Sequence, residues 1–153
     1  MKKNIIFLVL ILIATNLIAC GSSVSIGDKT PYTEVNDFPG ATMEVIEVNT
    51  DEEFITVEFS YSGPNELSYG TSSDEYEIEF FQNNEWYTLD YKKYDAMGLG
   101  HSVKDGETHT EDYRYTRYGK LPAGHYRIVK RVLDFIEAGN FTEHYLAAEF
   151  DIE

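Results

Sequence analysis

Strict alternation of apolar and polar residues is the feature that most constrains the fold of this chain. In the run FITVEFSY, Ile55, Val57 and Phe59 alternate with Thr56 and Glu58. Successive side chains of a β-strand point to opposite faces, so this run predicts a strand with one buried face and one wet face. Similar runs recur along the chain, and no long segment has helical periodicity.

Turn residues separate these runs, for example Asn83-Asn84 and Ala138-Gly139-Asn140. The spacing predicts an all-β fold, an antiparallel β-sandwich of about seven strands. Expected strands occupy residues 42–49, 53–63, 75–80, 85–91, 108–115, 125–135 and 141–152. Residues 92–106 fit no such pattern and are expected to form a crossing loop with at most one short strand.

The N-terminus predicts export. Lys2 and Lys3 precede an apolar run that ends in LIAC at Cys20, which is typical of a secretory signal. LIAC resembles the lipobox of bacterial lipoproteins, and the resemblance implies cleavage before Cys20 and a lipid on its thiol. The protein would then be anchored at the extracytoplasmic face of the cell membrane, or of the outer membrane in a Gram-negative cell. An uncleaved span is the alternative, although the run has roughly 16 apolar residues where roughly 20 are needed.

These features divide the chain into a signal peptide (1–19), a lipidated cysteine with a flexible tether (20–41) and a sandwich domain (42–153). Residues 21–41 contain few large apolar residues and several Gly, Ser and Pro, as linkers do. Cys20 is the only cysteine, so the exported domain contains no disulfide and depends on packing alone.

The charge of the chain excludes nucleic acid as a partner. The full chain has 12 basic and 27 acidic residues, and loss of Lys2 and Lys3 with the signal leaves 10 basic residues and a net charge of −17. Such a surface repels phosphate backbones and anionic lipid headgroups. The glutamates of the alternating run Glu75, Glu77 and Glu79 are expected to form a solvated stripe.

The run YGKLPAGHYRIVK, residues 118–130, predicts a structural role for one tyrosine. In immunoglobulin-like sandwiches, a tyrosine near the start of the penultimate strand bonds through its hydroxyl to the backbone a few residues upstream. Leu121, Gly124 and Tyr126 fit this tyrosine corner, and Ile128 takes the place where antibody domains carry a cysteine. Trp86 is the expected core tryptophan.

Together, YEIEFFQNNEWYTL and YGKLPAGHYRIVK resemble the Ig-like domain found in many bacterial, largely Gram-positive, surface lipoproteins. The resemblance covers residues 42–152. It implies an immunoglobulin-like β-sandwich at the cell surface, and it implies no particular biochemical activity.

No catalytic, cofactor or metal site is expected from the residues. The four histidines, His101, His109, His125 and His144, lie on separate segments without metal-binding spacing. His125 and His144 are the one pair that could face each other across neighbouring strands. The chain has no nucleophile elbow, phosphate-binding glycine loop or calcium loop. We therefore expect no enzyme activity.

The aromatic content predicts a binding surface. The chain has 12 tyrosines and nine phenylalanines, and tyrosines favour interfaces because they bury area and keep a polar group. The expected surface comprises Tyr87, Tyr91, Tyr94, Tyr113 and Tyr115. This favours a non-catalytic binding module for a protein or a cell-wall polymer. A proteinase inhibitor that uses loop 92–106, and a purely structural spacer, remain alternatives.

Overall fold

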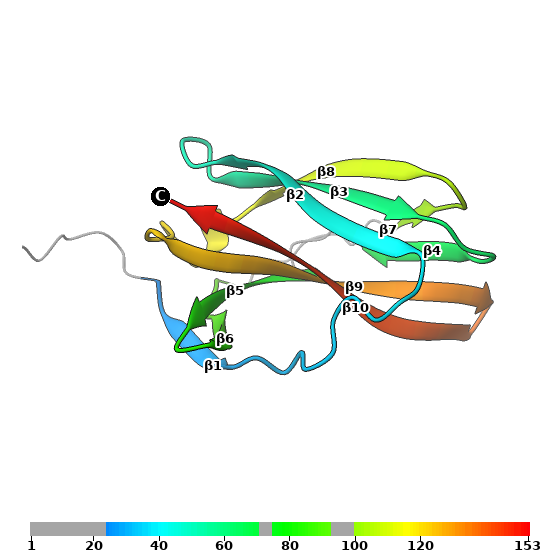
Figure 1. Ribbon diagram of the computed structural model, residues 1–153, viewed down its shortest axis with the longest axis horizontal. Coiled ribbons are helices and arrows are strands. Elements are labelled where there is room, and N and C mark those ends of the chain that lie inside the picture. The colour runs from blue at the N-terminus through cyan, green and yellow to red at the C-terminus, as the bar shows by residue number, and fades with distance from the viewer. Residues whose placement is uncertain (1–23, 71–74, 93–99) are drawn as a thin grey trace, which may run out of the picture.

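A computed structural model of the chain describes residues 24–70, 75–92 and 100–153 and shows two antiparallel sheets packed face to face (Figure 1). The strands are β1 (Ile26–Lys29), β2 (Ala41–Asn49), β3 (Phe54–Tyr61), β4 (Glu66–Gly70), β5 (Tyr76–Gln82), β6 (Glu85–Leu89), β7 (Gly100–Val103), β8 (Thr108–Arg114), β9 (Gly124–Glu137) and β10 (Asn140–Ile152). A short 3-10 helix, Thr116–Tyr118, follows β8. Within these residues there is no helix with the length and apolarity that a membrane span needs.

We call the two layers the long sheet and the short sheet. The long sheet has the order β1-β6-β5-β9-β4-β7, with β10 paired to β9, and the short sheet has the order β2-β3-β8. The predicted two-layer antiparallel sandwich is therefore confirmed, and each of the seven expected strands is present. The sequence patterns missed β1 and β4 because strands of four or five residues show too little alternation to be recognised.

The long strand β9 organises the long sheet. It pairs with β10 along its whole length, from Gly124↔Ile152 to Glu137↔Asn140. Its other edge pairs first with β5, at Tyr76↔Lys130, and then with β4, at Tyr69↔Val132. One strand thus holds together both halves of the long sheet. β7 lies within the segment expected to be a loop and joins the edge of β4, while residues 93–99 lie outside the described part.

The core lies between the inner faces of the two sheets. Its fully buried members follow the predicted alternation: Ile55, Val57 and Phe59 from β3, Ile78 from β5, Ile128 and Val132 from β9, and Leu146 from β10. Each inward apolar side chain is followed by an outward one, because strand side chains alternate between faces. The apolar period of the sequence therefore determines which face of each strand meets the other sheet.

Two cations are buried among tyrosines in this core. The ammonium group of Lys130 lies 5.3 Å and 4.8 Å from the ring centroids of Tyr69 and Tyr113, and burial lowers the pKa of Lys130 to about 8. The guanidinium of Arg117 stacks 4.1 Å from the ring centroid of Tyr91. Aromatic faces attract desolvated cations, so the tyrosine rings around Lys130 and Arg117 help to stabilise the two buried charges.

The tyrosine corner has the hydrogen bond expected of it. The Tyr126 hydroxyl donates to the backbone carbonyl of Pro122, four residues upstream, at 2.7 Å. Leu121 is buried beside it. A Cβ on Gly124 would lie 2.6 Å from the ring of Phe80, so a larger residue would displace that ring. These contacts close the turn that leads into β9.

Trp86 was expected in the core, and this prediction is wrong. Its side chain is half-buried on the outer face of the long sheet. There the indole lies 4.6 Å from the guanidinium carbon of Arg127 and 5.4 Å from the ring of His125. The short β6 pairs with β5 at Trp86↔Phe81, and Phe81 points outward because its neighbour Phe80 points inward.

Candidate functional site: a cleft beside the N-terminal strap

Residues 24–37, which we call the strap, cover the outer face of the long sheet (Figure 1). At its start the Asp90 amide donates to the Ser25 carbonyl at 2.9 Å, and β1 then pairs with β6. After β1 the Thr30 amide donates to the Trp86 carbonyl at 3.0 Å. The strap then crosses over the sheet towards β10.

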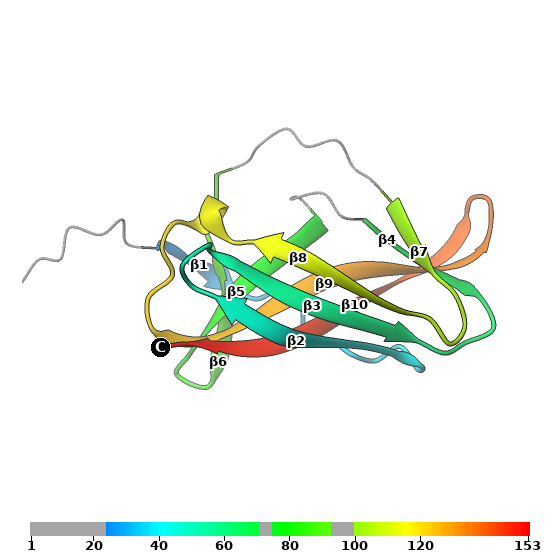
Figure 2. The ribbon, with the colours of Figure 1, turned by 90° about the horizontal axis from the view of Figure 1, so that it is seen from above.

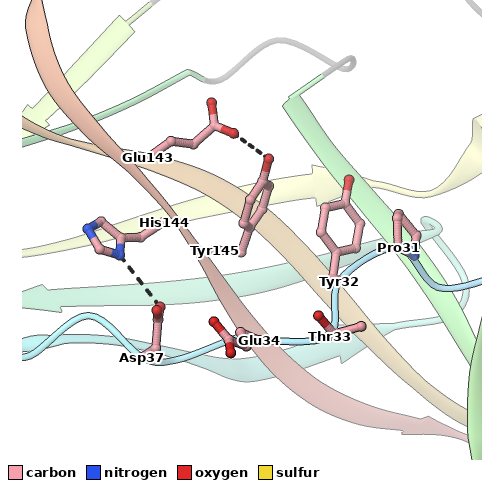
Figure 3. A pocket seen from close by; sticks show the side chains of 8 residues that line it. All are labelled: Pro31, Tyr32, Thr33, Glu34, Asp37, Glu143, His144 and Tyr145. Atoms are coloured by element: carbon pink, nitrogen blue, oxygen red, sulfur yellow. Dashed lines mark hydrogen bonds and ion pairs between the residues drawn. The ribbon is translucent and has the colours of Figure 1, made fainter.

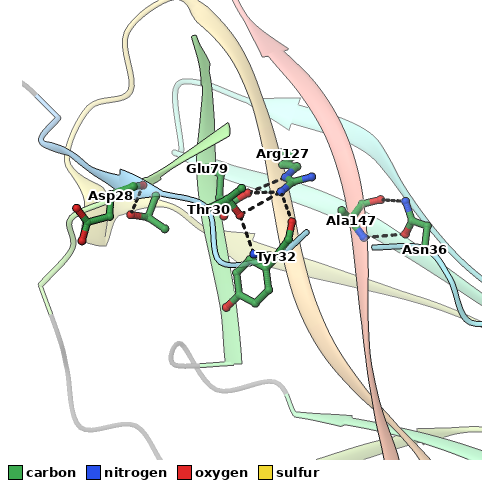
Figure 4. Close-up of polar contacts among 8 residues, drawn as sticks. Asp28, Thr30, Tyr32, Asn36, Glu79, Arg127 and Ala147 are labelled. Atoms are coloured by element: carbon green, nitrogen blue, oxygen red, sulfur yellow. Dashed lines mark hydrogen bonds and ion pairs between the residues drawn. The ribbon is translucent and has the colours of Figure 1, made fainter. Parts of the chain in front are cut away.

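Asn36 fastens the far end of the strap to β10 (Figure 4). Its backbone amide donates to the Tyr145 carbonyl at 2.8 Å. Its side-chain amide donates to the Ala147 carbonyl at 2.9 Å and accepts from the Ala147 amide at 2.8 Å. Asn36 has a φ of 59°, a conformation that asparagine tolerates better than most residues. The Asn36 side chain therefore hydrogen-bonds the Ala147 amide and carbonyl at the edge of β10, which a neighbouring strand could otherwise bind.

A buried ion pair lies beneath the strap (Figure 4). The Arg127 guanidinium donates to Glu79 Oε2 from Nε at 2.7 Å and from Nη2 at 2.6 Å. The same Nη2 lies 3.3 Å from the Thr30 hydroxyl and 3.4 Å from the Tyr32 carbonyl of the strap. Glu79 is 0% and Arg127 6% exposed. The prediction that Glu79 belongs to a solvated stripe is therefore wrong, because the strap excludes water from it.

The predicted flexible tether over residues 20–41 is also wrong for its described part. Residues from Ser25 onward are fixed to the sheet by the hydrogen bonds above. The apolar content of this segment is low, so its contacts are polar: backbone groups, Thr30 and Asn36. A linker-like composition indicates that a segment does not form its own core. It does not show whether another part of the fold binds the segment.

A cleft opens between the strap and β10 (Figure 3). It has a volume of about 260 Å³ and is lined by Pro31, Tyr32, Thr33, Glu34, Asp37, Glu143, His144 and Tyr145. The rings of Tyr32 and Tyr145 meet with centroids 4.8 Å apart and planes tilted by 45°. Tyr145 donates to Glu143 at 2.5 Å, and His144 Nδ1 lies 3.6 Å from an Asp37 oxygen.

The electrostatics of the cleft favour positive charge. Three carboxylates, from Glu34, Asp37 and Glu143, line it, and no Lys or Arg is among its lining residues. Glu143 pairs with Arg131 outside the lining at 3.2 Å, so the negative charge of the cleft comes mainly from Glu34 and Asp37. Burial, followed by the charge of Glu77, raises the pKa of Tyr32, and the hydrogen bond to Glu143 raises that of Tyr145. Both phenols therefore stay neutral at physiological pH and present aromatic faces beside carboxylates, a setting that suits an ammonium group.

The predicted tyrosine surface does not exist as a unit. Tyr113 and Tyr115 are each only 2% exposed, so the prediction that they contact a partner is wrong. Tyr87 and Tyr91 are half-buried, and Tyr94 lies outside the described residues. Tyr113 follows the inward positions of β8, where its ring meets Phe59 and Tyr76 edge-on. The number of tyrosines does not distinguish buried positions such as Tyr113 from exposed ones. The alternation within THTEDYR is the sequence signal that could have assigned Tyr113 to the inner face.

The histidines pair differently from the expectation. His125 lies opposite Asp151 and His144 opposite Val132 on the β9–β10 ladder, so these two histidines do not face each other. His101 and His109 instead stack across the two sheets, with ring centroids 5.1 Å apart. In the described part of the chain, no three His, Cys, Asp or Glu side chains are grouped as metal ligands.

The tyrosine corner and the two antiparallel sheets define an immunoglobulin-like β-sandwich. Residues 38–151 match the bacterial Ig-like domain family, and the chain belongs to that family. No curated protein and no solved structure matches the chain. The predicted Ig-like fold is thereby confirmed, and the strap lies N-terminal to the part that matches the family.

Proposed function

We propose that the protein is a lipid-anchored, extracytoplasmic Ig-like binding module without catalytic activity. Anchoring is supported by the basic start, the apolar run and LIAC, which places the lipid on Cys20. Because Ser25 is already fixed to the sheet, residues 21–24 alone would separate it from Cys20. A linker of this length spans at most roughly 18 Å. The start of the strap would therefore lie within roughly 18 Å of the membrane surface.

Binding is assigned to the cleft between the strap and β10, and the observation that carries the assignment is its lining. Carboxylates and tyrosine faces converge there, and the lining contains no Lys or Arg. The ligand class is a primary ammonium group, from a lysine side chain of a protein or from an amine on a cell-wall polymer. A volume of about 260 Å³ suits one side chain or amine. Pockets that bind drug-sized ligands have volumes of about 300–1,000 Å³, so this cleft is smaller than those pockets.

Titration of the soluble domain, residues 21–153, with tetralysine tests the cleft. We expect saturable binding with NMR shifts at Tyr32 and Tyr145, and no binding of the fully acetylated peptide. Glu34→Gln combined with Asp37→Asn should weaken binding at least about tenfold, the ratio that corresponds to 1.4 kcal/mol. The control is Glu44→Gln with Glu47→Gln, which removes the same charge from exposed positions of β2. Equal losses in the two double variants would show a non-specific charge effect and refute the site.

Membrane fractionation tests the anchor separately. The full-length protein should be in the membrane fraction, and Cys20→Ala should release it or leave it as an uncleaved precursor. Metabolic labelling with a fatty acid should mark the wild type and leave the variant unlabelled. An unlabelled wild type, or unchanged labelling of Cys20→Ala, would refute lipidation while leaving the cleft proposal intact.

A further inference from the structure

The end of the β9–β10 ribbon carries an exposed apolar cluster, which we call the tip: Phe135, Ile136 and Phe141. These side chains are 41%, 54% and 52% exposed. Phe135 and Phe141 are direct partners on the β9–β10 ladder, so their side chains lie next to each other on one face. Ile136 follows at the point where the ladder shifts register. Large apolar groups gathered in one exposed place usually mark an interaction site.

The tip projects beyond the rest of the long sheet. β4 pairs with β9 only as far as Glu66↔Phe135, and beyond that point β9 pairs with β10 alone among the described strands. Both ribbon views place this turn at the end of the sandwich opposite the C-terminus and the start of β1 (Figures 1 and 2). The tip therefore lies at the end of the sandwich opposite the start of the strap.

The charge around the tip is mainly negative. From Val132 to the last residue the sequence contains no Lys or Arg. Asp134 and Glu137 flank the apolar side chains on the ribbon, and Glu66 lies opposite Phe135 on β4. Further from the turn, Glu143 pairs with Arg131 at 3.2 Å and is not part of this rim. An apolar centre with an acidic rim is complementary to an apolar pocket with a basic rim.

Charge argues against the other occupants. Two acidic tips, one from each of two copies of this chain, would repel each other. Anionic lipid headgroups and phosphate-bearing polymers are repelled for the same reason. Phenylalanine and isoleucine offer no hydrogen bonds to a polyhydroxylated carbohydrate, so a protein pocket is the occupant that fits.

We propose that the β9–β10 tip docks into an apolar, basic-rimmed pocket of a partner protein. Phe135 and Phe141 act as the anchors, and the surrounding carboxylates orient the encounter. The site is distinct from the strap cleft, so the two proposals stand or fall separately.

A site-specific photocrosslink in living cells tests the tip. The full-length chain carries p-benzoylphenylalanine in place of Ile136 and is expressed in the cells that naturally make it. Ile46 is the matched control, because it is an isoleucine 53% exposed on the short sheet. We expect a discrete ultraviolet-dependent adduct with one protein from position 136, and none from position 46.

Four further measurements decide what the adduct means. Phe135→Ser with Phe141→Ser should reduce the adduct at least about tenfold, as loss of buried hot-spot side chains does. The purified complex should weaken as salt rises, and the partner's contact site should be rich in Lys and Arg. Glu34→Gln with Asp37→Asn should leave the adduct unchanged, which separates the tip from the cleft. Thermal unfolding of the Phe135/Phe141 variant should match the wild type, since both side chains are exposed.

Several outcomes would overturn the proposal. These are no adduct at position 136, equal adducts at positions 136 and 46, an adduct made of two copies of this chain, or an adduct with lipid. Sedimentation of residues 21–153 with zwitterionic and with anionic vesicles checks the lipid result independently. Binding to either that is lost in the Phe135/Phe141 variant would identify the tip as a membrane-contacting surface instead.

Discussion

The two faces of the long sheet are covered in opposite ways. Its inner face meets the short sheet through apolar side chains such as Phe59 and Ile128. Its outer face is covered by the strap, through hydrogen bonds from Asn36 and over a buried Glu79–Arg127 pair. The inner layer is stabilised by non-directional apolar burial, and the outer layer by directional contacts. The inner layer should therefore tolerate changes of shape poorly, and the outer layer should tolerate loss of a single polar partner poorly.

Deletion of a core ring should have the largest effect. Phe59→Ala removes a side chain that is 1% exposed and stacks on Tyr69 at 4.6 Å. We expect the free energy of unfolding to fall by about 3–5 kcal/mol, because the lost transfer energy and the cavity add together. Urea unfolding of the domain comprising residues 21–153 measures this free energy. Ile46→Ala, at an exposed position, should change it by less than about 0.5 kcal/mol. Similar losses in both variants would contradict the assignment of the inner face.

Breaking the buried ion pair should have the next largest effect. Glu79→Leu leaves the Arg127 guanidinium buried without its carboxylate, and we expect a loss of about 3 kcal/mol. Glu79→Leu with Arg127→Met removes both charges and should recover most of that loss. A double-mutant cycle by urea unfolding checks this. A double variant less stable than the single variant would mean that the two positions are not coupled as described.

The tyrosine corner should contribute less. Tyr126→Phe removes one hydroxyl that donates to the Pro122 carbonyl and leaves the ring packed against Phe80 and Phe150. The expected loss is about 1 kcal/mol. Tyr87→Phe is a suitable control, because the Tyr87 hydroxyl donates to the half-buried carboxylate of Glu85, two residues away. An unchanged unfolding midpoint for Tyr126→Phe would contradict the corner.

The smallest effect should be a pH dependence at the outer face. The hydrogen bond between His125 and Asp151 raises the pKa of His125 above the ordinary 6.5; burial opposes this with the next largest effect, and the hydrogen bond to Glu149 adds a smaller increase. Because the folded pKa is the higher one, this stabilisation is fully present below pH 6.5. It is lost as pH rises through the folded pKa. Stability should therefore fall between the pKa of His125 in the unfolded protein and its higher pKa in the folded protein. His125→Gln should remove this fall. An identical pH profile in the variant would rule out the contribution.

The same contrast explains what the sequence could predict. Alternation at Ile55, Val57 and Phe59 records which strand face is buried, so the layers and the tyrosine corner followed from local patterns. The outer face did not follow, because the local pattern around Glu79 indicates a solvated residue, and the strap that covers it comes from a distant part of the sequence. The cleft was missed for the same reason, since its walls come from two segments with no common sequence signal.

Amide hydrogen exchange at Ala147 tests most directly whether the strap is part of the folded domain. The Ala147 amide donates to the Asn36 side chain on an edge of β10 where no described strand pairs. In the soluble domain this amide should exchange slowly, and Asn36→Ala should speed its exchange at least about tenfold while amides of β9 remain protected. Exchange at Ala147 that is already fast in the wild type, or unchanged in the variant, would contradict the account.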